Sequence, residues 1–254
     1  MSDDVASEIL GRVGMITITR PDSLNAVTFA VVERVARQFE TWCSEGSVDG
    51  VVVSGTGDRA FAAGADIAEL QGKSVADMID TGMQHWLTRI RESPLPSVAA
   101  VSGFAFGGGC ELALACDIRL ATPTSKFGLP ELGLGIIPGA GGTQLLSRYA
   151  GISVASYHIL TGRPMSAERA HQIGLVSEIH EAAAIREAAI ALVEAMAAKG
   201  PLALRLAKRA IRASADTSLA AGLEVELLAQ AALFGTDERA EGLAAFVEKR
   251  TPHF

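Results

Sequence analysis

Short apolar runs alternate with segments of helical periodicity over the first 195 residues, and this alternation limits the chain to few fold classes. Apolar residues recur at helical spacing between Val27 and Trp42, and a further helix is predicted over 75–92. Strands that alternate with helices in this way are typical of an α/β protein. The predicted strands, which are apolar and mostly end on glycine or proline, are 13–20, 50–57, 97–103 and 117–123.

The pattern changes after about residue 195, where three helical segments follow one another with hardly a strand-forming residue between them. We therefore predict a core over residues 1–195 that carries the active site, and a C-terminal helical region over 196–254. That region is expected to pack on its own core or on a neighbouring subunit.

Composition excludes several classes of protein. The 22 basic residues against 29 acidic ones give a formal net charge of −7, which argues against a sequence-independent nucleic-acid binder. The three cysteines form no CxxC pair, and the scattered histidines lack metal-ligand spacing, so neither a disulfide framework nor a zinc site is predicted.

No segment suits a membrane anchor. The N-terminus, MSDDVASEIL, is acidic and has no apolar signal core. The longest uncharged run, 93–110, is half glycine, proline or serine, which makes a poor membrane helix. We expect a cytoplasmic protein that binds neither membrane nor nucleic acid.

An isolated carboxylate stands in the apolar segment FGGGCELALAC, residues 106–116. Glu111 could simply complement the dipole of a helix N-terminus, worth about 0.3–1 kcal/mol. The three glycines before it are poor helix formers, however, and indicate that something approaches the backbone closely. A carboxylate buried among apolar residues should have a raised pKa, which suits proton transfer.

Two further segments share this character. Glu131 follows Pro130 and precedes a run, 132–147, without any charge, so the two glutamates suggest an acid/base pair. In the segment 58–70, small residues surround Gly64 before a predicted helix start, and their N–H groups are candidates for binding an anion or a polarised carbonyl.

These segments resemble the motifs of the enoyl-CoA hydratase/isomerase (crotonase) family. The resemblance rests on RAFAAGADIAEL, AVSGFAFGGGCELALACDIRLA and FGLPELGLGIIPGAGGTQLL, and RPDSLNAV, LTGRPMSAERAHQIGLVSEI and EGLAAFVEKR extend it over nearly the whole chain in the family's order. It implies a crotonase-like spiral of β-β-α units followed by a helical trimerisation region. The implied assembly is a homotrimer or a homohexamer built as a dimer of trimers.

The resemblance also assigns roles to particular residues. It places the catalytic carboxylates at Glu111 and Glu131, and the two N–H groups of an oxyanion hole at Ala65 and Gly108. Where many hydratases have glutamine before Pro-Glu, this chain has Leu129. The implied contacts with the CoA thioester are Leu24, Ala63, Ala65, Asp66, Ile67, Ala68, Gly108, Phe246 and Lys249.

The implied activity is that of a hydro-lyase: an enoyl-CoA hydratase that adds water reversibly and syn to a 2-enoyl-CoA, giving a 3-hydroxyacyl-CoA, in fatty-acid or related acyl-CoA breakdown. Glu111 is expected to be the base and Glu131 the acid, and no metal or redox cofactor is expected. Met78, Met83 and Trp86 are candidates for the acyl pocket, with a plain core role as the equal alternative.

Three other functions are compatible with parts of the sequence. An enoyl-CoA isomerase would need only the carboxylate of Glu131. A non-catalytic acyl-CoA binder would explain the oxyanion segment but not two buried carboxylates. The G-x-G-x-x-A at 55–60 follows a strand and resembles half of a dinucleotide-binding motif, but that motif requires a helix where this sequence favours a loop.

Overall fold

The computed structural model describes residues 4–80 and 82–254, and within these ranges the strands form one six-stranded and one four-stranded sheet. The larger sheet has the order β1-β2-β3-β5-β7-β10, in which β1 is antiparallel to β2 and the other neighbours are parallel. Its strands are β1 Val5–Leu10, β2 Val13–Ile18, β3 Gly50–Gly55, β5 Ser97–Val101, β7 Ile118–Ala121 and β10 Glu178–Ile179.

The central strands are mostly apolar because both faces of the sheet are covered. Val51 and Val53 of β3 pack into one core cluster, and Val52 between them packs into the other. This alternation is the two-residue period of a strand. The first cluster also contains the apolar face of α1 (Phe29–Glu45), and the second contains that of α9 (Ile185–Ala197).

The smaller sheet, of order β4-β6-β8-β9, positions the site. Its parallel strands β4, β6 and β8 are three residues each, and the helix that carries Glu111 follows directly after β6. After Gly55 and Gly57 the chain continues into β4 and not into a helix, so the dinucleotide-binding alternative is wrong. The strands are β4 Ala60–Ala62, β6 Phe104–Phe106, β8 Lys126–Gly128 and β9 Met165–Ser166.

Helices cover the first core cluster around these sheets. The helix predicted over 75–92 is two helices, and Gly82 is the N-cap of the second of them. The remaining elements of the core are η1 Pro21–Ser23, α2 Ile67–Gln71, α3 Val75–Asp80, α4 Met83–Glu92, α5 Gly108–Ala115, η2 Glu131–Leu134, α6 Gly142–Ala150, α7 Ile152–Thr161 and α8 Ala167–Gln172.

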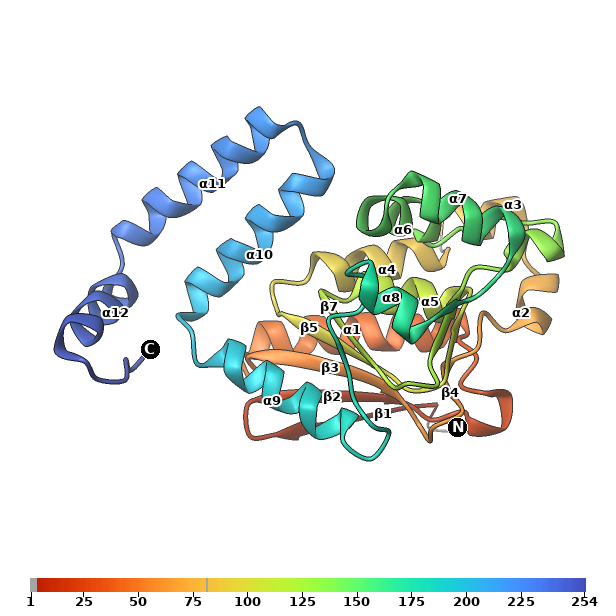
Figure 1. Cartoon of the computed structure of the whole chain (residues 1–254), viewed down its shortest axis with the longest axis horizontal. Helices are drawn as coiled ribbons and strands as arrows, with labels where there is room; N and C mark the ends of the chain where they lie inside the picture. The colour runs from red at the N-terminus through yellow and green to blue at the C-terminus, as the bar shows by residue number, and fades with distance from the viewer. Residues whose placement is uncertain (1–3, 81) are drawn as a thin grey trace.

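Three C-terminal helices extend away from the sheets: α10 Pro201–Asp216, α11 Leu219–Phe234 and α12 Asp237–Glu248 (Figure 1). Lys208 of α10 attaches them to the core, since its Nζ lies 2.6 Å from Asp117 Oδ2 and donates to the carbonyl of Leu95 at 2.7 Å. The boundary predicted at residue 195 falls inside α9, which still packs on the sheet.

The surface of α11 is unusually apolar. Leu219, Leu223, Leu227 and Leu228 are each more than half exposed, at 79%, 53%, 61% and 61%. A contiguous exposed apolar surface indicates an interaction site, and the predicted trimerisation by this region stays a prediction. Within the described residues no single helix is both long and apolar enough to cross a bilayer; only α11 and α12 together, bent by 76°, reach that length and composition.

Candidate active site

Glu111 lies in the first turn of α5, a helix whose every residue is buried, and is itself only 3% exposed. The glycines before it are explained by close packing. Gly107 has φ +48°, and a Cβ on Gly109 would lie 2.1 Å from the carbonyl oxygen of Ala62. Any side chain at residue 109 would therefore push α5 off β4, and the sequence signal for a close backbone approach is confirmed.

The carboxylate of Glu111 is held by backbone groups and not by a cation. Its Oε1 accepts the N–H of Ala140 at 2.7 Å and the N–H of Gly142 at 2.9 Å. Burial raises the pKa of Glu111, while these two hydrogen bonds act in the opposite direction. The sequence predicted free N–H groups around 132–147 but did not connect them to Glu111.

Glu131 begins η2 and lies beside the start of α5. Its Oε1 is 3.1 Å from the place where a Cβ of Gly107 would stand. Its Oε2 is buried and has no hydrogen-bond partner among the described residues. Burial, together with the nearby charge of Glu111, raises the pKa of Glu131 to about 7. The two predicted carboxylates thus meet at one place, and they lie in different environments.

The two backbone donors predicted from the resemblance also lie together. A Cβ on Gly108 would stand 3.6 Å from the nitrogen of Ala65. Ala65 pairs with Val27 in an isolated parallel bridge whose hydrogen bonds use the N–H groups of Val27 and Asp66, so the N–H of Ala65 is left out of it. Gly108 is the first residue of α5, where helical N–H groups have no partner within the helix.

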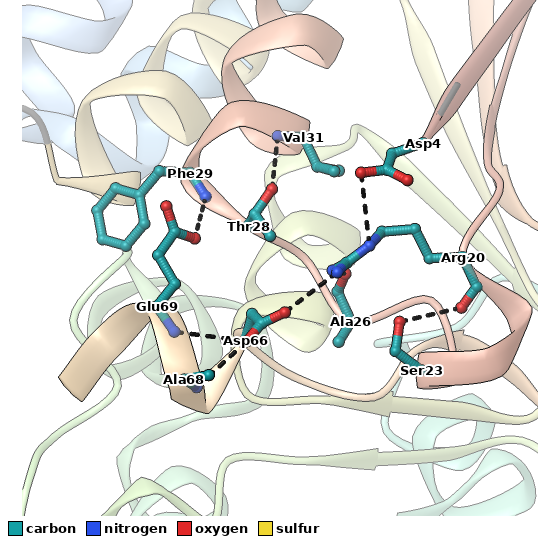
Figure 2. Close-up of polar contacts among 10 residues, drawn as sticks. All are labelled: Asp4, Arg20, Ser23, Ala26, Thr28, Phe29, Val31, Asp66, Ala68 and Glu69. Atoms are coloured by element: carbon teal, nitrogen blue, oxygen red, sulfur yellow. Dashed lines mark hydrogen bonds and ion pairs between the residues drawn. The ribbon is translucent and has the colours of Figure 1, made fainter. Parts of the chain in front are cut away.

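A polar network supports the Ala65 segment (Figure 2). The guanidinium of Arg20 donates to the carbonyl of Ala26 at 2.6 Å and to Asp66 Oδ2 at 3.1 Å. Asp66 also caps α2, because its Oδ1 accepts the N–H groups of Ala68 and Glu69. The hydrogen bond from Arg20 holds the pKa of Asp66 below its usual range. Sequence reasoning missed this role of Arg20.

The other predicted CoA contacts divide into two groups. Leu24 accepts the N–H of Ala63 at 3.0 Å through its carbonyl, and Ile67 and Ala68 follow on α2, so these residues surround the Ala65 segment. Phe246, which is 84% exposed, and Lys249 lie at the end of α12, on the opposite side of the molecule from α2 (Figure 1). One chain alone does not bring them to the site.

The three candidates for the acyl pocket also lie in different surroundings. Met83 is buried, with its Sδ 3.6 Å from the Cβ position of Gly108, whereas Met78 is 46% exposed. Trp86 makes cation–π contacts with Arg37 and Arg89, whose guanidinium carbons lie 5.1 and 5.3 Å from the ring centroid. Among the three, Met83 is the residue placed against the predicted oxyanion site.

Comparison with known proteins gives a consistent result. The family model of enoyl-CoA hydratase/isomerase matches residues 8–254. The chain is 43% identical to the 2,3-dehydroadipyl-CoA hydratase of Escherichia coli, over 96% of this chain and 95% of that protein. It is 41% identical to the mitochondrial enoyl-CoA hydratase of Pongo abelii, over 95% and 83%.

Solved structures agree. The crystal structure of enoyl-CoA hydratase from Bacillus anthracis superposes with a TM-score of 0.93 at 37% identity, covering 99% of this chain and 98% of that one. This likeness confirms the predicted crotonase-like α/β fold. The chain belongs to the enoyl-CoA hydratase/isomerase family, and its hydratase relatives make it an enzyme of the hydro-lyase type.

Proposed function

We propose that Glu111 and Glu131 catalyse the reversible syn addition of water to a 2-enoyl-CoA, giving a 3-hydroxyacyl-CoA. The observation that carries this assignment is the meeting of two carboxylates with raised pKa beside two backbone N–H groups. The carboxylates supply a base and an acid, and the N–H groups supply a site for developing negative charge.

The environments of the two carboxylates support different roles. Burial raises the pKa of Glu111, but two N–H groups donate to its Oε1 and act against that rise, whereas Glu131 has an oxygen without such donors, so we assign Glu111 as the group that takes a proton from the attacking water. Glu131, with a pKa of about 7 and an unpaired buried oxygen, holds a proton that it delivers to C2. In dehydration the two roles are exchanged.

The thioester oxygen gains charge as water attacks C3. We place that oxygen between the N–H groups of Ala65 and Gly108, where the N-terminus of α5 adds its dipole. Losing one such donor typically lowers the rate about 10²–10³-fold. Because a Cβ at residue 108 would point toward this space, glycine is required there.

The proposal extends to binding and assembly. Leu24, Ala63, Asp66, Ile67 and Ala68 would contact the CoA thioester around Ala65. Since Phe246 and Lys249 lie at the far end of the molecule, their contact with acyl-CoA has to be made on a second copy of the chain, in a homotrimer or homohexamer. The apolar surface of α11 supports such an assembly.

Proton transfer between water, two carboxylates and the substrate accounts for the hydration, so we propose no cofactor beyond the CoA of the substrate. We further propose a cytoplasmic enzyme of acyl-CoA breakdown, in fatty-acid or related metabolism. The name of the Escherichia coli relative, 2,3-dehydroadipyl-CoA hydratase, supports a place in such breakdown.

The test follows the loss of the ultraviolet absorbance of crotonyl-CoA with wild type, Glu111→Ala and Glu131→Ala. We expect turnover by the wild type and a loss of about 10²–10⁴-fold in each variant. An inactive wild type with crotonyl-CoA and with longer 2-enoyl-CoAs would contradict hydration. Turnover of a 3-enoyl-CoA that is lost in Glu131→Ala alone would identify an isomerase.

A further inference from the structure

A cavity of about 180 Å³ lies next to Glu111 and is used by none of the steps above. Ala140, which donates its N–H to Glu111, lines this cavity, and so does Ala115, one helical turn after Glu111 on α5. Gln84 lines it too and is adjacent in sequence to Met83, whose sulfur approaches Gly108. The cavity therefore borders the residues that hold Glu111 and lies next to Met83, close enough to the site to receive part of a substrate.

The lining of the cavity is partly apolar and partly polar. Leu87, Ala115 and Ala140 are buried and form its apolar part. Arg91 is eight residues beyond Met83 on α4, about 12 Å at 1.5 Å per residue, and Arg148 is six residues beyond Gly142 on α6, about 9 Å. Both guanidinium groups bond to the C-terminal end of α10, Arg91 to Asp216 and Arg148 to the carbonyl of Ala215, and these contacts define the far end of the cavity.

This far end carries a net positive charge. The charged residues of the lining are two arginines and one carboxylate, Asp216. Asp216 accepts two hydrogen bonds from Arg91, at 2.9 and 3.0 Å. Arg91 Nε is buried and has no acceptor in the part of the chain that the structure describes. Arg148 is fixed by bonds to Ala215 and Gln144, so the cations are held in place before any ligand arrives.

We propose that this cavity takes the tail of the acyl group, and that Arg91 and Arg148 bind a carboxylate at the end of that tail. The substrate class is then the 2-enoyl-CoA thioesters of short dicarboxylic acids. This inference rests on the proposed hydratase function and names its substrate. A terminal carboxylate would meet charge-assisted donors there, whereas a neutral methyl end would leave them without a partner.

The size of the cavity agrees with a short tail. At roughly 30 Å³ for each water-sized group, 180 Å³ has room for about six such groups, enough for a few methylenes and a carboxylate. Arg148 is itself exposed, as are Gln84 and Thr88, so a charged end bound at Arg148 keeps part of its hydration. A charge placed there avoids the cost of full burial.

The experiment compares two six-carbon 2-enoyl-CoAs, one ending in a carboxylate and one ending in a methyl group. We expect wild type to favour the carboxylated substrate in kcat/KM by about tenfold, the equivalent of one charge-assisted contact. Arg148→Gln and Arg91→Gln should each abolish most of this preference. Arg169 is an exposed arginine of α8 that is not among the residues lining the cavity, so Arg169→Gln is the matched control and should keep the preference.

A second measurement uses the wild type alone and needs no folded variant. Salt should lower the preference for the carboxylated substrate, because screening weakens the exposed charge contact while the CoA part is common to both substrates. Turnover of crotonyl-CoA without any preference for the carboxylated tail, or a preference that both arginine variants retain, overturns this inference and leaves the hydratase proposal standing. Failure to turn over any enoyl-CoA overturns both.

Discussion

Gly142 donates its N–H to Glu111 Oε1 over 2.9 Å, and a Cβ on residue 142 would stand 3.0 Å from that same oxygen. Gly142→Ala should therefore displace the proposed base. A shift of about 1 Å at a catalytic group can cost about 10² in rate, so we expect kcat to fall by ten- to a hundredfold. Gly139→Ala, three residues before Gly142, is the control, because its Cβ meets nothing closer than 3.6 Å. Equal kcat in both variants would show that the space around Gly142 does not position Glu111.

Gly108 and Gly109 are neighbours with different functions, so alanine should have different effects on stability and activity at the two positions. At residue 109 the Cβ would lie 2.1 Å from backbone, so Gly109→Ala should lose roughly 1–3 kcal/mol of stability or more. At residue 108 the nearest atom is a Val27 methyl at 3.1 Å, so Gly108→Ala should fold while filling the thioester site. Thermal melting and kcat/KM together check this, with a loss in kcat/KM of about 10² expected for Gly108→Ala.

Arg20 supports the Ala65 donor through Asp66 and Ala26, and Arg20→Met should loosen that donor. We expect kcat to fall about tenfold, and the melting temperature to fall because the hydrogen bonds of Arg20 to Asp66 and Ala26 are lost. Arg20→Lys, which keeps the charge, should recover part of kcat. A variant that melts earlier while its kcat is unchanged at low temperature would show that Arg20 only stabilises the fold.

The raised pKa of Glu131 sets the activity at alkaline pH. Hydration needs one proton on the pair of carboxylates, and so does dehydration, because the roles are exchanged. As pH rises through about 7 the pair loses this proton, so kcat/KM should fall in both directions with the same apparent pKa. Rate profiles measured from both sides of the reaction check this. Alkaline limbs at different pH values would contradict a shared proton.

The same pKa makes a prediction about stability. Between pH 4.5 and about 7 the folded chain holds a proton on Glu131 that the unfolded chain releases. The contribution of this bound proton to the stability of the fold is therefore full below pH 4.5 and is lost as pH rises through 7. Glu131→Gln, which stays neutral, should raise the melting temperature relative to wild type by more at pH 8 than at pH 5. An equal difference in melting temperature between variant and wild type at pH 5 and pH 8 would show that Glu131 is not buried as a neutral acid.

The elements predicted from the sequence are those with a clear apolar pattern. α1 lies where its helical periodicity placed it, and β2, β3, β5 and β7 lie where short apolar runs predicted strands, because burial requires apolar side chains in these segments. β1 has no apolar pattern in its sequence, because only Val5 among its residues is fully buried. The strands of the smaller sheet are too short for any periodicity to show, and they are the strands that carry the site.

The site shows a similar division. Glu111 and Glu131 could be found because their side chains contrast with apolar surroundings. The N–H groups of Ala140 and Gly142 could not be assigned, since every residue except proline carries one and only folding selects which of them face a carboxylate. Burial explains the raised pKa of Glu131, but the bonds that favour ionised Glu111 depend on a loop nearly thirty residues away.

Residue 140 takes part in two tasks with separate chemical groups. Its main chain fixes the proposed base, and the same residue borders the cavity assigned to the acyl tail. Any amino acid other than proline at this position retains the donor, whereas its side chain changes the shape of the cavity. Selection for new acyl groups can therefore act on residue 140 while the proton chemistry is inherited unchanged, which makes this position a natural site for diversification of substrate range.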